Sequence, residues 1–298
     1  MQEKNNLTKS YSKGIAAIII SAFGFATMAF FVKQAGDVPV LQKAVFRNLI
    51  TMIVSFLLLL RSREKFYLAP KNRWTMFWRC TFGTIGFVAN FWAIQNLYLG
   101  DASILQKMSP FFAILMSVIW LHEKPNKIAV LSIFVALLGA VFVVKPSAGL
   151  VSLPAMVGLF GGFCAGSAYT LVRKLGVGGV PGPLIIFSFS LFSVLAISPA
   201  VVCHYQPMTW PQTANLLLAG FCAVIGQVFV TKAYTYAPAK EISVFDYSQV
   251  IFAALLGFIF LQEIPDTYSL IGYVIIILTA VLKCYWEGKI AQSPKEDA

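Results

Sequence analysis

The chain has 298 residues, of which 58% are hydrophobic and only 12% are charged, and its mean hydropathy is +0.77. A soluble domain carries roughly 25% charged residues, so the composition excludes an ordinary soluble protein. The net charge of +11 does not indicate a nucleic-acid ligand, because the basic residues concentrate at the termini and in alternate loops between apolar segments. These continuous segments also exclude a β-barrel, whose strands alternate in polarity over about ten residues.

Ten apolar segments are predicted to be membrane-spanning helices, because a helix of roughly 20 apolar residues crosses a bilayer. In chain order we expect them at residues 14–33, 41–60, 74–97, 102–121, 127–144, 151–172, 182–203, 213–236, 242–261 and 267–286. The distribution of lysine and arginine among the loops predicts that both termini are cytoplasmic. The sequence therefore indicates a multi-pass protein of the cell (inner or plasma) membrane, with cytoplasmic tails at 1–13 and 287–298.

One segment occurs twice in the chain. FFAILMSVIWLHEKP (residues 111–125) and IFAALLGFIFLQEIP (residues 251–265) match at seven of fifteen positions, at an offset of 140 residues. The same offset relates Lys33 to Arg173. Two repeats, at 14–147 and 148–286, would each contain five spans, and an odd number per repeat makes the second an inverted copy of the first. Lys33 would then face the outside of the cell, as a relic of duplication.

The order of these motifs resembles the EamA family of the drug/metabolite transporter superfamily. The resemblance rests on FRNLI (46–50), LGDASILQKMSP (99–110) and the two segments that end in Leu-x-Glu-x-Pro. It implies an all-α integral membrane fold, with ten transmembrane helices as two inverted five-helix repeats. It also implies transport of amino acids or other metabolites, along a path where the first four helices of each repeat converge. The second repeat departs from the pattern in two ways. Val250 stands where the first repeat has Pro110, and the seventh span has no arginine equivalent to Arg47.

Charged residues within the predicted spans are candidates for function, because each costs several kcal/mol unless it faces protein or a wet cavity. Lys107 and Asp246 occupy near-equivalent places in the two repeats. For Lys107, the alternatives are a structural or snorkelling role and a role in transport. For Asp246 there are two hypotheses. It faces a cavity, as ion-pair partner, proton carrier or substrate contact, or it forms a buried structural salt bridge to Lys232 or Arg79.

Polar residues at helical spacing extend the predicted path along the third and eighth spans. Interhelical hydrogen bonds are the alternative for the amides and the threonine, and core packing is the alternative for the aromatic residues. The predicted substrate or ion path comprises Arg47, Arg79, Asn90, Trp92, Gln95, Lys107, Gln227, Thr231, Tyr234 and Asp246.

Three further residues are predicted to lie at boundaries or gates. Glu123 and Glu263 lie near the end of the two copies of the repeated segment, two residues before the final proline. Each either marks the membrane boundary before the next helix or forms a gating ion pair with a nearby loop cation. Pro110 is expected to kink the fourth span, as a hinge or as a feature that shapes the cavity.

The expected function is a secondary active transporter that moves a small organic metabolite by alternating access, as an exporter or exchanger. Five in-span cations against one acid favour an amino acid or another anionic or zwitterionic amphiphilic solute. The alternative is a facilitative carrier or channel-like permease for a nucleotide-type or drug-like metabolite. Enzyme motifs such as GxSxG and HExxH do not occur, so we expect no catalytic residue, metal or cofactor. The expected partners are the solute, protons as coupling ion and the lipid bilayer, with no nucleic acid, in a monomer or homodimer.

Overall fold

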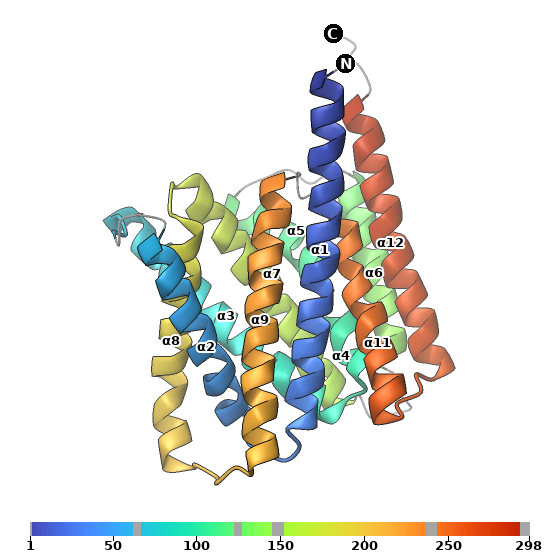
Figure 1. Cartoon of the computed structure of the whole chain (residues 1–298). Coiled ribbons are helices and arrows are strands. Elements are labelled where there is room, and N and C mark those ends of the chain that lie inside the picture. The colour runs from blue at the N-terminus through green and yellow to red at the C-terminus, as the bar shows by residue number, and fades with distance from the viewer. Residues whose placement is uncertain (1, 62–66, 122–126, 145–151, 237–242, 293–298) are drawn as a thin grey trace.

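The structure, a computed structural model, describes residues 2–61, 67–121, 127–144, 152–236 and 243–292, and all regular elements within these ranges are helices (Figure 1). They are α1 (Gln2–Gln34), α2 (Val40–Arg61), α3 (Pro70–Asn96), α4 (Leu99–Gln106), α5 (Ser109–Leu121), α6 (Lys127–Val144), α7 (Leu153–Val177), α8 (Gly182–Cys203), α9 (Trp210–Tyr236), the 3-10 helix η1 (Ser243–Tyr247), α11 (Ser248–Leu261) and α12 (Thr267–Gln292). The predicted all-α membrane fold is confirmed. The bounds of α6 and α8 equal the predicted ranges.

The fourth span, for which a kink at Pro110 is predicted, consists instead of two helices. They are α4 and α5, and the break lies at Lys107 and Met108. Proline disfavours helical geometry in the residue before it, and it is well tolerated in the first turn of a new helix. Pro110 therefore does not kink one helix but stands second in α5, just after the break. In the ninth span, the turn η1 precedes α11 and carries Asp246.

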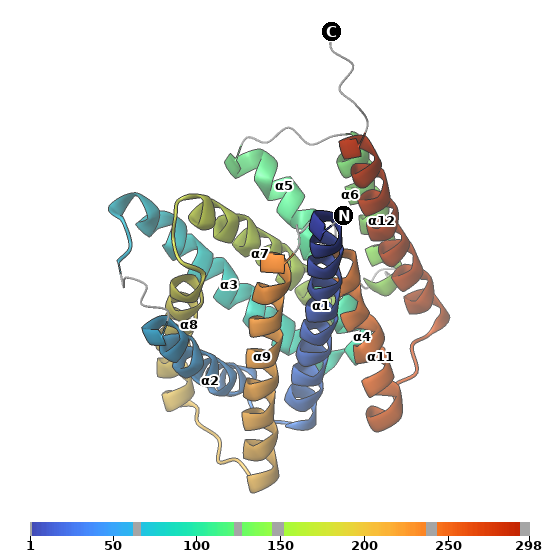
Figure 2. The ribbon, with the colours of Figure 1, turned by 45° about the horizontal axis from the view of Figure 1, so that its top comes forward.

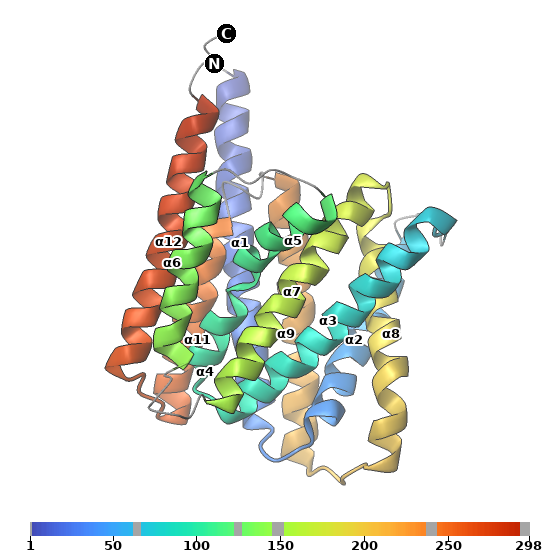
Figure 3. The same cartoon turned by 180° about the vertical axis from the view of Figure 1, so that it is seen from behind.

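The two halves cross the membrane in opposite directions. Helix α1 leads away from the end of the molecule where both termini lie, whereas α7, the first helix of the second half, leads towards it (Figures 1 and 3). Each half supplies five crossing elements once α4 is counted with α5 and η1 with α11. The halves are therefore inverted copies, as the odd number of spans per repeat predicts.

Helices from opposite halves pack together in symmetric pairs. Helix α1 lies along α9 and α7 lies along α3, while α6 and α12 pair at the periphery (Figure 2). The first two crossings are close: a Cβ atom on Gly24 would lie 2.9 Å from the backbone nitrogen of Gly226, and one on Gly86 would lie 2.8 Å from Cys164 Cβ. The offset of 140 relates Gly86 to Gly226 and Gly24 to Cys164. The small residues thus serve the same close helix packing in both halves.

Gly166→Ala is expected to lower the melting temperature of the purified protein. A Cβ atom at position 166 would lie 2.4 Å from the carbonyl oxygen of Ser109 and 2.8 Å from the nitrogen of Ala113, both backbone atoms of α5. Because backbone cannot rotate away, we expect the unfolding free energy to fall by about 1–3 kcal/mol.

Gly176→Ala, in the same helix, is the matched control. A Cβ atom there meets no atom within 4 Å, and alanine favours a helix over glycine by about 1 kcal/mol. Equal melting temperatures for the two variants would contradict the role assigned to the contact between α5 and α7.

Candidate functional site

The break in the fourth span and the turn η1 of the ninth span meet at an ion pair. Lys107 follows the end of α4, and its Nζ lies 2.5 Å from Oδ2 of Asp246 in η1. The Tyr247 hydroxyl donates a hydrogen bond of 3.0 Å to the carbonyl oxygen of Lys107. Lys107 is buried and Asp246 is partly buried. Asp246 therefore pairs with Lys107, and not with Arg79, which was one of the two partners that the sequence suggested. The side chain of Lys232, the other suggested partner, lies outside the described residues.

A second ion pair lies where α1 and α11 end, at the end of the molecule opposite the termini (Figure 1). Lys33, in the last turn of α1, pairs with Glu263 and also donates to the carbonyl oxygen of Leu97. Gln262 ends α11 in the left-handed region, at φ 56°, and the chain turns there so that Glu263 accepts the N–H of Leu99 at 2.6 Å. The carboxylate thus joins α1, α11 and the start of α4.

This geometry bears on two expectations. Glu263 is buried and forms an ion pair, so of its two alternatives the structure favours the ion pair over a simple mark of the membrane boundary. Lys33, interpreted as a relic of duplication, has a carboxylate partner of its own. Glu123, the other acid of the repeated segment, lies outside the described residues, as does the side chain of Pro110.

Arg47 of α2 and Arg79 of α3 are both buried, with 6% and 9% of their surfaces exposed. The guanidinium of Arg47 lies 4.9 Å from the ring centroid of Phe87 and donates to Asn48 Oδ1 at 2.6 Å. The guanidinium of Arg79 lies 4.4 Å from the ring centroid of Phe189. Within the described part of the chain, Nε of Arg47 and both Nε and Nη1 of Arg79 have no hydrogen-bond partner.

Tyr169 belongs with these residues, although the sequence analysis did not select it. Its side chain is 57% exposed and lies within electrostatic range of Arg47, Arg79 and Asp246. These three residues come from α2, α3 and η1, so Tyr169 of α7 stands near charged residues of three other elements. The signal in the sequence was its position three residues after Gly166, on the small-residue side of the sixth span.

Several other charged and polar residues have structural partners. Lys43 is fully buried and donates to the carbonyl oxygen of Gly36 at 2.6 Å and to Gln95 Oε1 at 3.4 Å. Gln95 thus helps to hold α2 against α3. Asp101, buried in the first turn of α4, accepts a hydrogen bond of 2.7 Å from the Tyr273 hydroxyl. The count of one in-span acid is therefore wrong, because Asp101 is a second.

The remaining predicted path residues are spread along α3 and α9. Asn90 and Trp92 are half-buried in α3, where the backbone nitrogen of Asn90 lies near Gly161 of α7. Thr231 and Tyr234 belong to α9, but their side chains lie outside the described residues. The structure does not bring Asn90 and Trp92 to either ion pair, and their place on a path stays a prediction.

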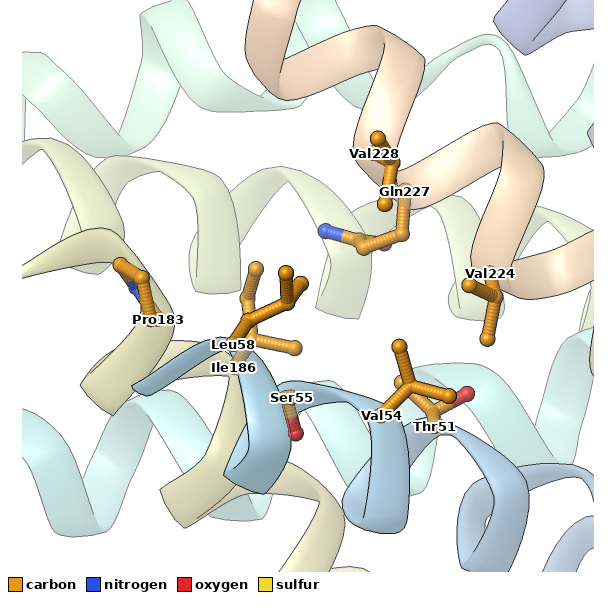
Figure 4. A pocket seen from close by; sticks show the side chains of 9 residues that line it. All are labelled: Thr51, Val54, Ser55, Leu58, Pro183, Ile186, Val224, Gln227 and Val228. Carbon is orange, nitrogen blue, oxygen red and sulfur yellow. The ribbon is translucent and has the colours of Figure 1, made fainter. Parts of the chain in front are cut away.

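A cavity of about 200 Å³ lies among α2, α8 and α9 (Figure 4). Gln227 extends from α9 towards α2, and Thr51 lies at the edge of the cavity one turn after Arg47, to whose carbonyl oxygen it donates at 3.2 Å. The other lining side chains are mainly apolar. They are those of Val54, Ser55, Leu58, Pro183, Ile186, Val224 and Val228.

The EamA-like transporter family model matches the chain twice, at residues 12–145 and 152–283. The chain belongs to this family. These two matches correspond to the inverted halves of the structure, and a protein of this family is a membrane transporter and not an enzyme.

Individual relatives of this EamA-family protein align with most of its length. The pseudopaline exporter of Pseudomonas aeruginosa is 29% identical over 270 residues, which cover 90% of this chain and 94% of the exporter. The riboflavin transporter of Vibrio cholerae is 26% identical over 216 residues, 71% of each chain. A solved crystal structure superposes with a TM-score of 0.64 over 96% of this chain and 99% of the other, at 15% identity. That last likeness supports the fold alone.

Proposed function

We propose that this protein is a secondary active transporter that exports or exchanges a small organic metabolite by alternating access. The observation that carries the proposal is the meeting of two inverted halves at the ion pair of Lys107 and Asp246, where the fourth span is broken and the ninth carries a 3-10 turn. Inverted repeats with discontinuous helices and a site near the bilayer midplane are a recurrent design of secondary transporters. The similarity to a pseudopaline exporter favours export as the direction.

The arrangement of charges suggests an orientation for this cycle. The basic loops favour a cytoplasmic location for both termini. The pair of Lys33 and Glu263 lies at the opposite end of the molecule, on the outer side in this orientation. We infer that this pair and its contacts to Leu97 and Leu99 hold the outer side closed, as a gate that opens when the halves rock.

A counterflow assay in proteoliposomes tests the proposed transport. Vesicles are loaded with unlabelled alanine, glutamate, citrate or riboflavin, and entry of the same labelled compound is followed against empty liposomes. We expect transient accumulation that saturates with concentration for at least one compound. Flux that never saturates would indicate a channel, and no protein-dependent flux of any of the four would contradict the proposal.

A further inference from the structure

Two buried arginines suggest what this transporter carries. We infer that Arg47 and Arg79 form a subsite for the oxyanion of the transported solute, either a carboxylate or a phosphate group, with Tyr169 as a third polar contact. The inference rests on the proposed transport function and names the chemical class of its solute, an organic anion.

The charges of Arg47 and Arg79 are not balanced by a carboxylate within the described residues. Arginine stays protonated in proteins, and a buried charge is strongly destabilising unless an opposite charge is paired with it. Lys33 and Lys107 each have a carboxylate partner. Within the described part of the chain, no carboxylate lies at ion-pair distance from Arg47 or Arg79, and three of their donor nitrogens have no acceptor. The bound anion supplies the missing charge and the missing acceptors.

The two arginines are both held beside one stretch of α3. Arg79 Nη1 lies beside Gly83, where a Cβ atom would be only 2.3 Å away, and the guanidinium of Arg47 lies over the ring of Phe87. Gly83 and Phe87 are four residues apart on α3, so they lie on one face, about 6 Å apart along the helix. The inferred anion would contact Arg47 from α2 and Arg79 from α3 beside this turn.

Aromatic rings hold both guanidinium groups. Phe87 and Phe189 each cover the face of one guanidinium. Stacking occupies the face of the group, so its N–H donors point outward in the plane, and two such donors match the two oxygens of a carboxylate or phosphate. The donors without an acceptor have almost no exposed surface, so an anion reaches them only when the surrounding helices move. The absence of a side chain at Gly83 provides the space that the guanidinium of Arg79 occupies.

Tyr169 connects the subsite with the ion pair of Lys107 and Asp246. Its side chain lies within electrostatic range of both arginines and of Asp246. The opposite charges of Lys107 and Asp246 balance each other, which leaves the two arginines as the net positive charge that attracts the anion.

The test is binding of defined anions to the purified full-length protein, measured by the shift of its melting temperature. The probes are citrate, glutamate, inorganic phosphate and, as an uncharged analogue, triethyl citrate. We expect at least one of the three anions to stabilise the wild-type protein and the ester not to do so. In Arg47→Gln and in Arg79→Gln, the affinity for that anion should fall by about tenfold or more. Stabilisation by citrate or glutamate alone identifies a carboxylate subsite, and stabilisation by phosphate alone identifies a phosphate subsite.

Two further variants separate a site from a general effect of charge. Arg73→Gln removes an exposed arginine from the same helix and should leave the affinity unchanged. Gly83→Ala keeps every charge but displaces the guanidinium of Arg79, so it should weaken anion binding. Without ligand, Arg79→Gln should melt at or above the wild-type temperature, because it removes a buried charge that has no partner. A lower ligand-free melting temperature with unchanged anion affinity overturns the inference in favour of a structural role.

The failure of this inference is distinguishable from the failure of the proposed function. Equal stabilisation by the ester and the anions, or no stabilisation by any of the three anions, removes the subsite but leaves saturable counterflow of alanine or riboflavin intact. Anion binding that depends on Arg47 and Arg79 in a protein without counterflow retains the subsite and removes the transporter cycle.

Discussion

Asp246→Asn is expected to abolish counterflow of the most active solute among alanine, glutamate, citrate and riboflavin. The substitution removes the charge that balances Lys107 at the junction of the two halves, while the amide oxygen can still accept one hydrogen bond. Truncating one partner of a buried ion pair typically destabilises a protein by about 3–5 kcal/mol. Because the asparagine retains an acceptor, we expect the loss of stability to fall below that range and the protein to remain in the membrane.

A double variant separates transport from stability at this pair. Lys107→Met with Asp246→Leu replaces both charges by apolar side chains, which leaves no buried charge without a partner. Its melting temperature should recover relative to either single substitution, whereas transport should remain absent. Wild-type transport rates in Asp246→Asn would remove the pair from the mechanism. Recovered transport in the double variant would reduce the pair to a structural contact.

Lys33→Glu is expected to have the second large effect, because it places two carboxylates against each other at the end of α11. Glu263 is buried and also accepts the N–H of Leu99, so it cannot move away without losing that hydrogen bond. We expect the unfolding free energy to fall by about 3–5 kcal/mol and transport to be lost. Thermal unfolding and the same counterflow assay measure both effects.

The charge swap is the control for this substitution. Lys33→Glu with Glu263→Lys restores an ion pair of opposite polarity, but it does not restore the carboxylate acceptor for Leu99 or the ammonium donor to the carbonyl oxygen of Leu97. Recovery should therefore be partial, in stability more than in transport. A swap that recovers nothing would assign the effect to the two backbone contacts, and one that recovers everything would assign it to charge alone.

The architecture could be predicted because its signals are local and repeated. The lengths of the apolar segments predicted ten spans. The offset of 140 residues divided them into two repeats of five, and an odd number of spans per repeat predicted that the halves are inverted. Even the pair of Lys33 and Glu263 was within reach, since ten spans place the ends of the first and ninth on the same side of the membrane. The break between α4 and α5 and the turn η1 were not predicted, because Pro110 fits a kink as well as a new start and the second repeat has Val250 in its place.

Side-chain pairing was harder to predict because it depends on the rotation and depth of helices far apart in the sequence. Lys107 and Asp246 were recognised as near-equivalent, but nothing local indicates that the end of α4 and the turn η1 meet. Lys43 resembled Arg47 as an in-span cation, yet it is satisfied by the carbonyl of Gly36 and by Gln95, whereas Arg47 retains a donor without an acceptor. Tyr169 carries no charge, and its importance appears only from the residues that surround it.

The hydrogen bond between Tyr247 and Lys107 joins two positions that the duplication made equivalent, because they are 140 residues apart. Residues that contact their own counterparts lie at the pseudo-twofold axis. Exchanging the two halves maps Lys107 and Asp246 onto Tyr247 and Gln106, so an ion pair in one state corresponds to a contact between uncharged side chains in the mirror-related state. We therefore expect the two states of the cycle to differ in energy, so that the empty protein rests with one entrance preferentially open.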